Sequence, residues 1–436
     1  MQDQTLQLSR RSLLRSAGWL GAGLAGSAML PGRLLAQAST EQMYPAVTNL
    51  VCDYVASGRL PGAVVALGWG SAAPAQIARG TLAFDSAVPV DLDSLYRIYS
   101  MTKPITGMAA MMLVDAGRIG LDQPISDFLP RFARMQVQVT PDGSITDLKP
   151  AQTAITLRHL LTHTAGLGYT IIQKGPIKEA YEAAGLVPAR ATRLAIPPFG
   201  GVATAPTLAL FADRLAEMPL VYEPGTKFSY SVGLDLVGRL IEVVSGQTFD
   251  AFLAEHLFGP CGMTSTVWQV SAAQAPRLTT NYLLHDGKTD PLDPGATSIY
   301  LDPPAFPFGG AGLVSSPRDY DRFLMMLAGG GQIGGTRVMS EAAVRLGTSN
   351  LLPQTVDLAG SWIENAGFGA GGRVGLGADA GTYGWSGAAG TTGFVNTRVG
   401  LRAGMFVQFM PSMALPIQEE FPKAVLSDVS AMKKAA

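Results

Sequence analysis

The sequence predicts an α+β fold in which one antiparallel sheet is assembled from both ends of the chain and a helical segment is inserted between them. Extended apolar stretches occur near the beginning of the chain and again near its end, whereas helical periodicity dominates the middle. This order fits an α/β sandwich lobe of about 39–100 and 335–436 and an all-helical lobe of about 101–334. We expect a cleft where the two lobes meet.

The first strands of the predicted sheet come from the beginning of the chain. Residues 62–69 form a continuous apolar run that is entered through Pro61, a pattern typical of a buried strand. Residues 76–84 are predicted to fold back on this strand as a hairpin. A third, short extended stretch at 95–99 leads directly into Ser100.

A central helix is predicted immediately after Ser100. Apolar side chains recur at helical spacing from Ile105 until Gly117 ends the pattern. Pro104 falls in the first turn, where its missing N–H has no intrahelical partner. Further helices are predicted at 157–161 after a Thr156 cap, at 234–244 before Gly246, and at 317–327 after a Ser316 cap.

The rest of the chain combines loops with a second set of strands. Two stretches are too rich in Pro and Gly for regular elements and are expected to form loops around the cleft, namely 168–219 and 286–312. The chain then ends with predicted strands at 391–397 and 405–410, a turn at 398–404 between them, and a closing helix at 417–432.

Composition excludes several function classes. The 32 basic and 33 acidic residues nearly cancel, which favours a small-molecule substrate over nucleic acid or an anionic membrane as the partner. Neither a metal nor another cofactor is expected, because no metal-ligand spacing occurs among His159, His163, His256 and His285. Cys52 and Cys261 are interpreted as small buried hydrophobic residues, with a disulfide between them as the alternative.

The first 38 residues are typical of an export signal. Arg10 and Arg11 precede an apolar stretch at 17–30, and small residues follow at 36–38, where cleavage is expected. The arginine pair indicates a twin-arginine signal and a periplasmic or secreted protein. The apolar stretch is too short and too rich in Gly for a membrane span, so no stable anchor is expected after cleavage. Retention as an uncleaved anchor is the alternative.

Ser100 and Lys103 form a candidate nucleophile and base. Their spacing of three residues at the start of a helix places both side chains on one face. A serine hydroxyl needs a neighbouring base, and a lysine in a crowded, partly apolar site can accept the proton or assist a second base. The helix N-terminus adds positive potential where an oxyanion would form. Alone, the pattern is weak, because a helix cap with a solvated lysine has the same spacing.

Five sequence blocks strengthen this interpretation. The first is Ser100-Met101-Thr102-Lys103. The other four are Leu160-Leu161-Thr162-His163-Thr164-Ala165-Gly166-Leu167, Tyr222-Glu223-Pro224-Gly225 with Phe228-Ser229-Tyr230-Ser231, Gly309-Gly310-Ala311-Gly312-Leu313 and Tyr383-Gly384-Trp385-Ser386-Gly387. In this order they resemble the serine β-lactamase and penicillin-binding superfamily, in particular class C β-lactamases and the family VIII carboxylesterases. The resemblance covers nearly the whole chain after the signal and implies a β-lactamase/transpeptidase-like fold.

The resemblance implies roles for the matching residues. Ser100 would be the acylated nucleophile, Lys103 its hydrogen-bonding partner, and Tyr230 the group that relays the proton to the leaving oxygen. A phenol ordinarily ionises near pH ~10, so a neighbouring cation is needed for such a group to act near neutrality. The backbone N–H groups of Ser100 and Ala388 would form the oxyanion hole. Substrate would bind along the third motif, which is Trp385, Ser386 and Gly387.

Two departures from the family pattern bear on the substrate. Val232 stands where the β-lactamases and peptidases carry the Asn of Tyr-x-Asn, and Trp385 stands where they carry the Lys of K-T-G. Both changes remove groups that would bind an amide or a carboxylate, and they favour short-chain or aryl carboxylic esters. β-Lactamase or D-alanyl-D-alanine carboxypeptidase activity is the alternative, followed by acyl transfer to an alcohol. The sequence contains no G-x-S-x-G, which argues against an α/β-hydrolase.

Overall fold

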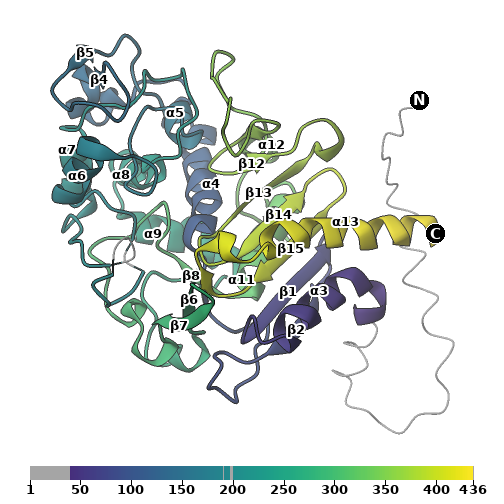
Figure 1. Ribbon diagram of the computed structural model, residues 1–436. Coiled ribbons are helices and arrows are strands. Elements are labelled where there is room, and N and C mark those ends of the chain that lie inside the picture. The colour runs from purple at the N-terminus through teal and green to yellow at the C-terminus, as the bar shows by residue number, and fades with distance from the viewer. Residues whose placement is uncertain (1–39, 190, 197–199, 436) are drawn as a thin grey trace, which may run out of the picture.

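The computed structural model describes residues 40–189, 191–196 and 200–435, and it forms a sheet lobe and a helical lobe (Figure 1). The main sheet has seven strands in the order β11-β12-β13-β14-β15-β1-β2, and all neighbours are antiparallel. Its strands are β1 (Gly62–Trp69), β2 (Ala75–Gly80), β11 (Gly367–Phe368), β12 (Arg373–Val374), β13 (Thr382–Ser386), β14 (Thr392–Asn396) and β15 (Leu401–Phe406). The predicted α+β fold, with an antiparallel sheet built from both chain ends, is therefore confirmed.

Helices cover both faces of this sheet. Alternate side chains of β1 point to opposite faces, so Val65 packs with α3 (Pro45–Ala56) and α13 (Ile417–Ala435), while Val64 packs toward α4 (Thr102–Asp115) and α11 (Pro317–Ala328). Almost every residue of β1 is buried, as the continuous apolar run predicted. Helix α11 contacts β1, β14 and β15, although it lies within the 101–334 segment assigned to the helical lobe.

The helical lobe is organised around α4, which follows the predicted central helix closely. Helix α4 packs against α8 (Gly233–Ser245) on one side and against α12 (Glu341–Gly347) on the other. The other helices of this segment are α5 (Leu157–Leu161), α6 (Gly175–Ala183), α7 (Leu208–Leu215), α9 (Phe249–Leu253) and α10 (Gly259–Cys261). The caps predicted at Thr156 and Ser316 both accept the N–H three residues later.

The Pro- and Gly-rich stretches contain regular elements that the sequence did not reveal. Helices α6 and α7 lie within 168–219, where loops were predicted, because proline is compatible with the first turn of α6 and Thr207 caps α7. Likewise, 286–312 contains strand β7 (Lys288–Asp293), which pairs with β6 (Asn281–His285). Other short strands are β3 (Tyr96–Arg97), β4 (Gln136–Gln138), β5 (Leu148–Pro150), β8 (Val314–Ser315), β9 (Gln332–Ile333), β10 (Thr336–Arg337) and β16 (Phe409–Met410).

The last long strand was predicted too late in the chain. Strand β15 begins at Leu401, within the stretch predicted as a turn, and the chain then continues into β16, which pairs with β6. Arg402 explains the error, since its fully buried guanidinium is paired with Asp321 of α11, with a distance of 2.9 Å between Nε and Oδ1. A buried arginine in a strand cannot be recognised from hydrophobic periodicity.

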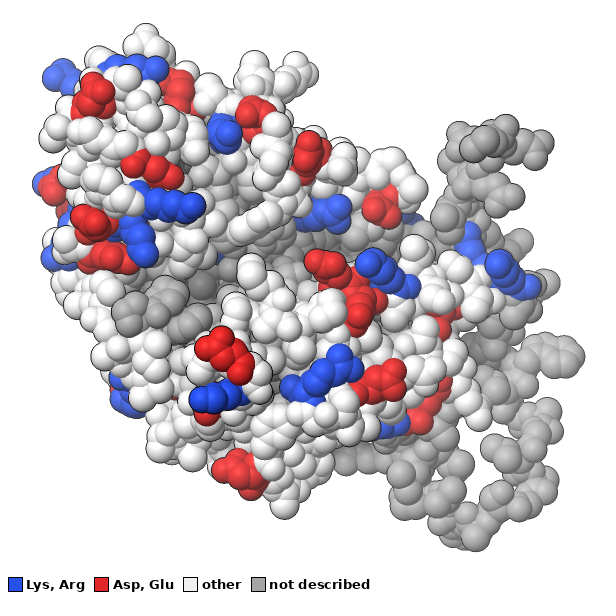
Figure 2. All heavy atoms as spheres, viewed as in Figure 1, with Lys and Arg blue, Asp and Glu red and all other residues white. Residues whose placement is uncertain are grey.

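On the face shown in Figure 2, blue and red side chains are interspersed and do not gather into a patch of one sign. Cys52 and Cys261 are free thiols. Within the described ranges, no helix combines the length and apolarity that a bilayer span requires. The predicted signal at 1–38 lies outside the described residues.

Candidate active site

Ser100 lies in a tight turn between the sheet and α4. The 3₁₀ turn η1 (Tyr99–Met101) carries it, and the N–H of Ile98 donates to Leu313 O at 3.0 Å, which fixes the approach to the turn. Tyr99 has φ 40°, in the left-handed region that a bulky residue rarely adopts. Such strain persists only where the surrounding structure imposes it, and it is typical of functional turns. The fold therefore holds the Ser100 hydroxyl in one position at the N-terminus of α4.

Lys103 is completely buried and points back to Ser100. Its Nζ donates to Ser100 Oγ at 3.2 Å and to the carbonyl oxygen of Gly310 at 2.7 Å. Gly310 belongs to the fourth of the sequence blocks, so a loop distant in sequence holds the lysine. The structure thus brings together the serine and the amine that the sequence paired.

Tyr230 completes the cluster and lies within an aromatic box. Lys103 Nζ is 4.5 Å from the centroid of its ring, within the range of a cation–π contact, and Trp385 Nε1 donates to its hydroxyl at 3.1 Å. The rings around it, with centroid distances from Tyr230, are His163 at 4.5 Å, Trp362 at 5.3 Å, Tyr169 at 5.6 Å and Trp385 at 5.8 Å. Both the cation and the indole N–H stabilise negative charge near the phenol oxygen.

The third motif ends strand β13 beside the Ser100 turn. β12 pairs with β13 only at Tyr383 and Gly384, so Trp385 and Ser386 have no partner on that side. A Cβ at Gly387 would lie 2.5 Å from Ile98 O, which means that only glycine permits this approach to the turn before Ser100. Within the described residues, the N–H of Ala388 makes no hydrogen bond.

Side chains and backbone fix the turn that follows β13. The hydroxyls of Ser386 and Thr392 are 2.8 Å apart, and Gly387 donates its N–H to Thr391 O at 2.7 Å. Gln418 of α13 donates to the carbonyl oxygens of both Gly387 and Thr391 at 2.8 Å. These hydrogen bonds hold the end of the third motif in a fixed position.

Asp235 is a further member of the site that sequence reasoning missed. It is fully buried in the first turn of α8, and the N–H of Gly310 donates to its Oδ1 at 2.9 Å. Burial raises the pKa of the Asp235 carboxyl to about 6, while the positive charge of Lys103 and backbone N–H groups oppose the rise. Asp235 therefore orients the same glycine whose carbonyl oxygen holds Lys103. The sequence could have indicated Asp235 only as a single acidic residue within the otherwise apolar helix start at 234–237.

His163 has a structural place beside the cluster. The N–H of Ser231 donates to its Nδ1 at 3.2 Å, so Nδ1 is an acceptor and the ring proton lies on Nε2. Burial, followed by the charge of Lys103, holds the pKa of His163 well below its usual range. The ring is therefore neutral and packs against Tyr230, with 4.5 Å between the two ring centroids.

The predicted loop stretches contain five aromatic residues that could line the pocket or pack the loops, namely Tyr169, Phe199, Tyr300, Phe306 and Phe308. Of the four that the structure describes, Tyr169 is the one that lies in the cluster. Tyr169 lies 5.6 Å from Tyr230 and 5.7 Å from Lys103 Nζ, measured from its ring centroid. Phe306 and Phe308 pack against each other at 4.0 Å, and Tyr300 lies 5.7 Å from the guanidinium of Arg97. Phe199 lies outside the described residues.

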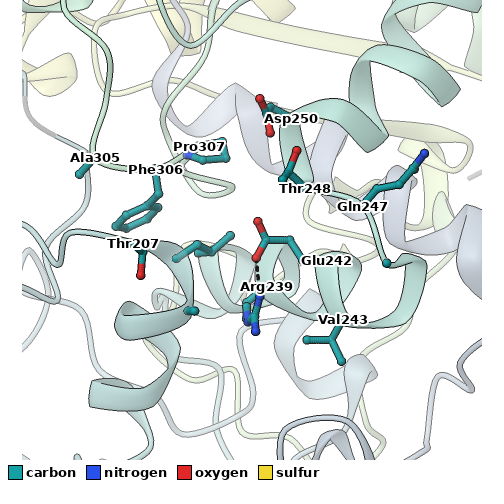
Figure 3. A pocket seen from close by; sticks show the side chains of 13 residues that line it. Thr207, Arg239, Glu242, Val243, Gln247, Thr248, Asp250, Ala305, Phe306 and Pro307 are labelled. Atoms are coloured by element: carbon teal, nitrogen blue, oxygen red, sulfur yellow. Dashed lines mark hydrogen bonds and ion pairs between the residues drawn. The ribbon is translucent and has the colours of Figure 1, made fainter.

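A separate hollow of about 570 Å³ lies along the C-terminal half of α8 (Figure 3). Ser100, Lys103 and Tyr230 are not among its lining residues. Two of its three charged side chains, Arg239 and Glu242, already bind each other at 2.8 Å, and the third is Asp250. Across the part of the chain that the structure describes, no group of three or more His, Cys, Asp or Glu side chains is arranged to hold a metal ion. The chemistry therefore concentrates at the Ser100 cluster.

Comparison with known proteins agrees with this geometry. The profile of the family described as Beta-lactamase matches residues 47–420. This chain belongs to the beta-lactamase family. The match spans the Ser100, Tyr230 and Trp385 blocks, so all three candidate motifs lie within the part that the family shares.

Relatives of this beta-lactamase family member include uncharacterized and named proteins. An uncharacterized protein of Mycobacterium tuberculosis is 37% identical over 300 residues, which make up 68% of each chain. Esterase EstB of Burkholderia gladioli is 30% identical over 358 residues, covering 74% of this chain and 80% of EstB. The structure of EstCE1, described as a hydrolase with promiscuous acyltransferase activity, shares the fold with a TM-score of 0.69 at 24% identity, covering 88% of this chain and 99% of EstCE1.

We predict that the Asp235→Asn variant gains stability relative to the wild type as the pH rises. In the unfolded chain an aspartate releases its proton near pH ~3.9, before the folded state does at about 6, so the wild type loses stability between these values. The loss amounts to about 3 kcal/mol by pH 7.5, of which about 2 kcal/mol falls between pH 4.5 and pH 7.5, and Asn does not share it. Urea unfolding of both proteins at pH 4.5 and pH 7.5 measures this change. A difference in unfolding free energy that is the same at both pH values would contradict it.

Proposed function

We propose that this beta-lactamase family protein is a serine hydrolase that cleaves short-chain or aryl carboxylic esters through an acyl-enzyme on Ser100. The position of Lys103 Nζ carries the proposal, because this atom lies 3.2 Å from Ser100 Oγ and 4.5 Å from the ring centroid of Tyr230. Lys103 thus contacts both a hydroxyl and a phenol, and a serine nucleophile needs such a basic neighbour to take up its proton.

Acylation begins with attack of Ser100 Oγ on the ester carbonyl carbon. The hydroxyl proton passes to the basic pair of Lys103 and Tyr230 as the C–O bond forms. The negative charge that develops on the carbonyl oxygen is bound by the N–H groups of Ser100 and Ala388 and by the N-terminus of α4. Collapse of the tetrahedral intermediate breaks the bond to the alcohol oxygen, which takes a proton from Tyr230.

Deacylation repeats these steps with water in place of serine. Water attacks the acyl carbon and gives its proton to Tyr230, and Ser100 recovers a proton as the carboxylic acid leaves. Trp385 contributes to both halves of the reaction, because its indole N–H binds the Tyr230 oxygen at 3.1 Å and holds the phenol in position. Losing one oxyanion donor typically costs about 10²–10³ in rate, so the two N–H groups account for much of the acceleration.

An ester is favoured over a β-lactam or peptide by two side chains. Val232 is fully buried and apolar, so the second motif offers no amide to bind a substrate amide. Trp385 is neutral and turns its indole N–H to Tyr230, where a lysine would present a cation to a substrate carboxylate. The relation to esterase EstB supports the same choice.

Acyl transfer is the second candidate. The same acyl-enzyme would be resolved by an alcohol in place of water, with the alcohol proton taken up by Tyr230. EstCE1, which shares the fold, is described as having promiscuous acyltransferase activity. β-Lactamase or D-alanyl-D-alanine carboxypeptidase activity is the remaining alternative, and the family's description as Beta-lactamase supports the first of the two.

We predict that p-nitrophenyl butyrate is hydrolysed faster than nitrocefin, a chromogenic β-lactam, because the site lacks the polar groups that bind a β-lactam. Ser100→Ala should reduce ester hydrolysis at least about 10³-fold through loss of the nucleophile. Initial rates at matched concentrations measure both effects. Faster turnover of nitrocefin would reverse the assignment, and a p-nitrophenol rate that rises with added alcohol would favour acyl transfer.

We predict that Tyr230→Phe lowers kcat for the ester about 10²–10⁴-fold, the range typical of a lost general acid or base. The ring packing remains, so the melting temperature should stay close to that of the wild type. Tyr181→Phe is a matched control, because Tyr181 is also a buried tyrosine and, among the described residues, the N–H of Gly168 is the one hydrogen-bond partner of its hydroxyl. A near wild-type rate for Tyr230→Phe would remove the phenol from the mechanism.

We also propose that the protein is exported by the twin-arginine pathway and acts in the periplasm or beyond. The arginine pair and the apolar stretch that follows it support this proposal. Replacing Arg10 and Arg11 by lysine should keep the chain in the cytoplasm with residues 1–38 attached. Cell fractionation followed by N-terminal sequencing measures this, and normal export of the double variant would refute the assignment.

A further inference from the structure

Trp362 exposes a large apolar surface next to the candidate nucleophile. The side chain is 65% exposed, and its ring centroid lies 5.3 Å from that of Tyr230, which is itself almost fully buried. Indole rings usually bury most of their surface, so an exposed one beside a reactive group needs an explanation. The ring forms the outer end of an aromatic row that continues through Tyr230 to Trp385.

The loop that carries Trp362 is fixed to the segment leading into Tyr230. Asp357 donates its N–H to Thr226 O at 2.8 Å and accepts from the N–H of Phe228 at 3.1 Å. Its carboxylate also pairs with Lys227 at 3.6 Å. Ile363, the next residue after Trp362, is buried with Phe228 in a small apolar cluster. The backbone therefore holds the indole in place beside the phenol.

We propose that Trp362 forms one wall of a subsite that binds a flat, uncharged aromatic group on the alcohol side of the ester. This inference rests on the proposed function, in which Tyr230 gives its proton to the leaving alcohol oxygen. A group attached to that oxygen must lie near the phenol, and the indole face is the exposed apolar surface there. Offset stacking of two rings adds to the free energy of burying apolar area, which favours an aromatic over a small alkyl alcohol.

Two esters of butyric acid test the proposal, because benzyl and ethyl alcohols are similar leaving groups and differ mainly in the ring. Trp362→Ala should lower kcat/KM for benzyl butyrate about tenfold, the size expected for one aromatic stacking contact. The value for ethyl butyrate should change less than about threefold, since no ring is lost from contact. Trp362→Phe keeps an aromatic surface and should retain most activity toward the benzyl ester.

Two controls separate a subsite from a general defect. Phe84→Ala removes another exposed aromatic ring, 46% exposed and 5.0 Å from the ring of Tyr282, and should change neither ester. Ethyl phenylacetate carries its ring on the acyl side and should respond to Trp362→Ala no more than ethyl butyrate does.

The possible outcomes distinguish this inference from the proposed function. Equal losses on benzyl and ethyl butyrate, no loss on either, or a larger loss on ethyl phenylacetate would each overturn the alcohol-side subsite while leaving ester hydrolysis intact. A wild-type protein that cleaves none of the three esters would refute the proposed function, and this inference with it.

Discussion

The side-chain nitrogen of Lys103 has no access to solvent, and a lysine so placed is stable only if its surroundings replace water. The protein supplies the carbonyl oxygen of Gly310 at 2.7 Å, the hydroxyl of Ser100 at 3.2 Å and the face of the Tyr230 ring. Asp235 adds a buried carboxylate that binds the N–H of the same glycine. These partners come from η1, from α8 and the segment before it, and from the loop ahead of β8, so the arrangement exists only when these elements are packed together.

The dependence on Lys103 also explains the glycines nearby. A Cβ at Gly310 would lie 2.6 Å from an oxygen of Asp235, and a Cβ at Gly387 would collide with the backbone before Ser100. The backbone can therefore approach the charged groups closely enough to bind them directly. The third motif then contributes a neutral indole, and Trp385 binds the phenol that the lysine also contacts. The amine thus links the nucleophile to the phenol, and the phenol in turn contacts the third motif.

Much of the fold was predictable because its elements carry strong local signals. Strand β1 is a continuous apolar run, α4 and α8 have clear helical periodicity, and Ser316 caps α11. Helices α6 and α7 were missed because α6 begins with glycine and proline and α7 follows Pro206, so that both starts resemble loop sequence. Strand β15 was misplaced because Arg402 is buried by a partner 81 positions away, which no local pattern can reveal.

The residues of the site also fall into those that the sequence could predict and those that it could not. Ser100, Lys103, Tyr230 and Trp385 stand in recognisable motifs, and the structure brings their side chains together. Asp235 and Trp362 stand outside these motifs, because their significance depends on burial in one case and exposure in the other. Both properties arise from tertiary packing, and neither residue type is informative without it.

The central claim is that Ser100 becomes covalently acylated, and the most direct test is to trap this species. The purified protein is treated with p-nitrophenyl butyrate, quenched in acid within the first turnovers, and digested for mass spectrometry. The account predicts a butyryl group on the peptide that contains Ser100, with accumulation that disappears in Ser100→Ala. A butyryl group on a different residue, or turnover of the ester by Ser100→Ala at the wild-type rate, would contradict it.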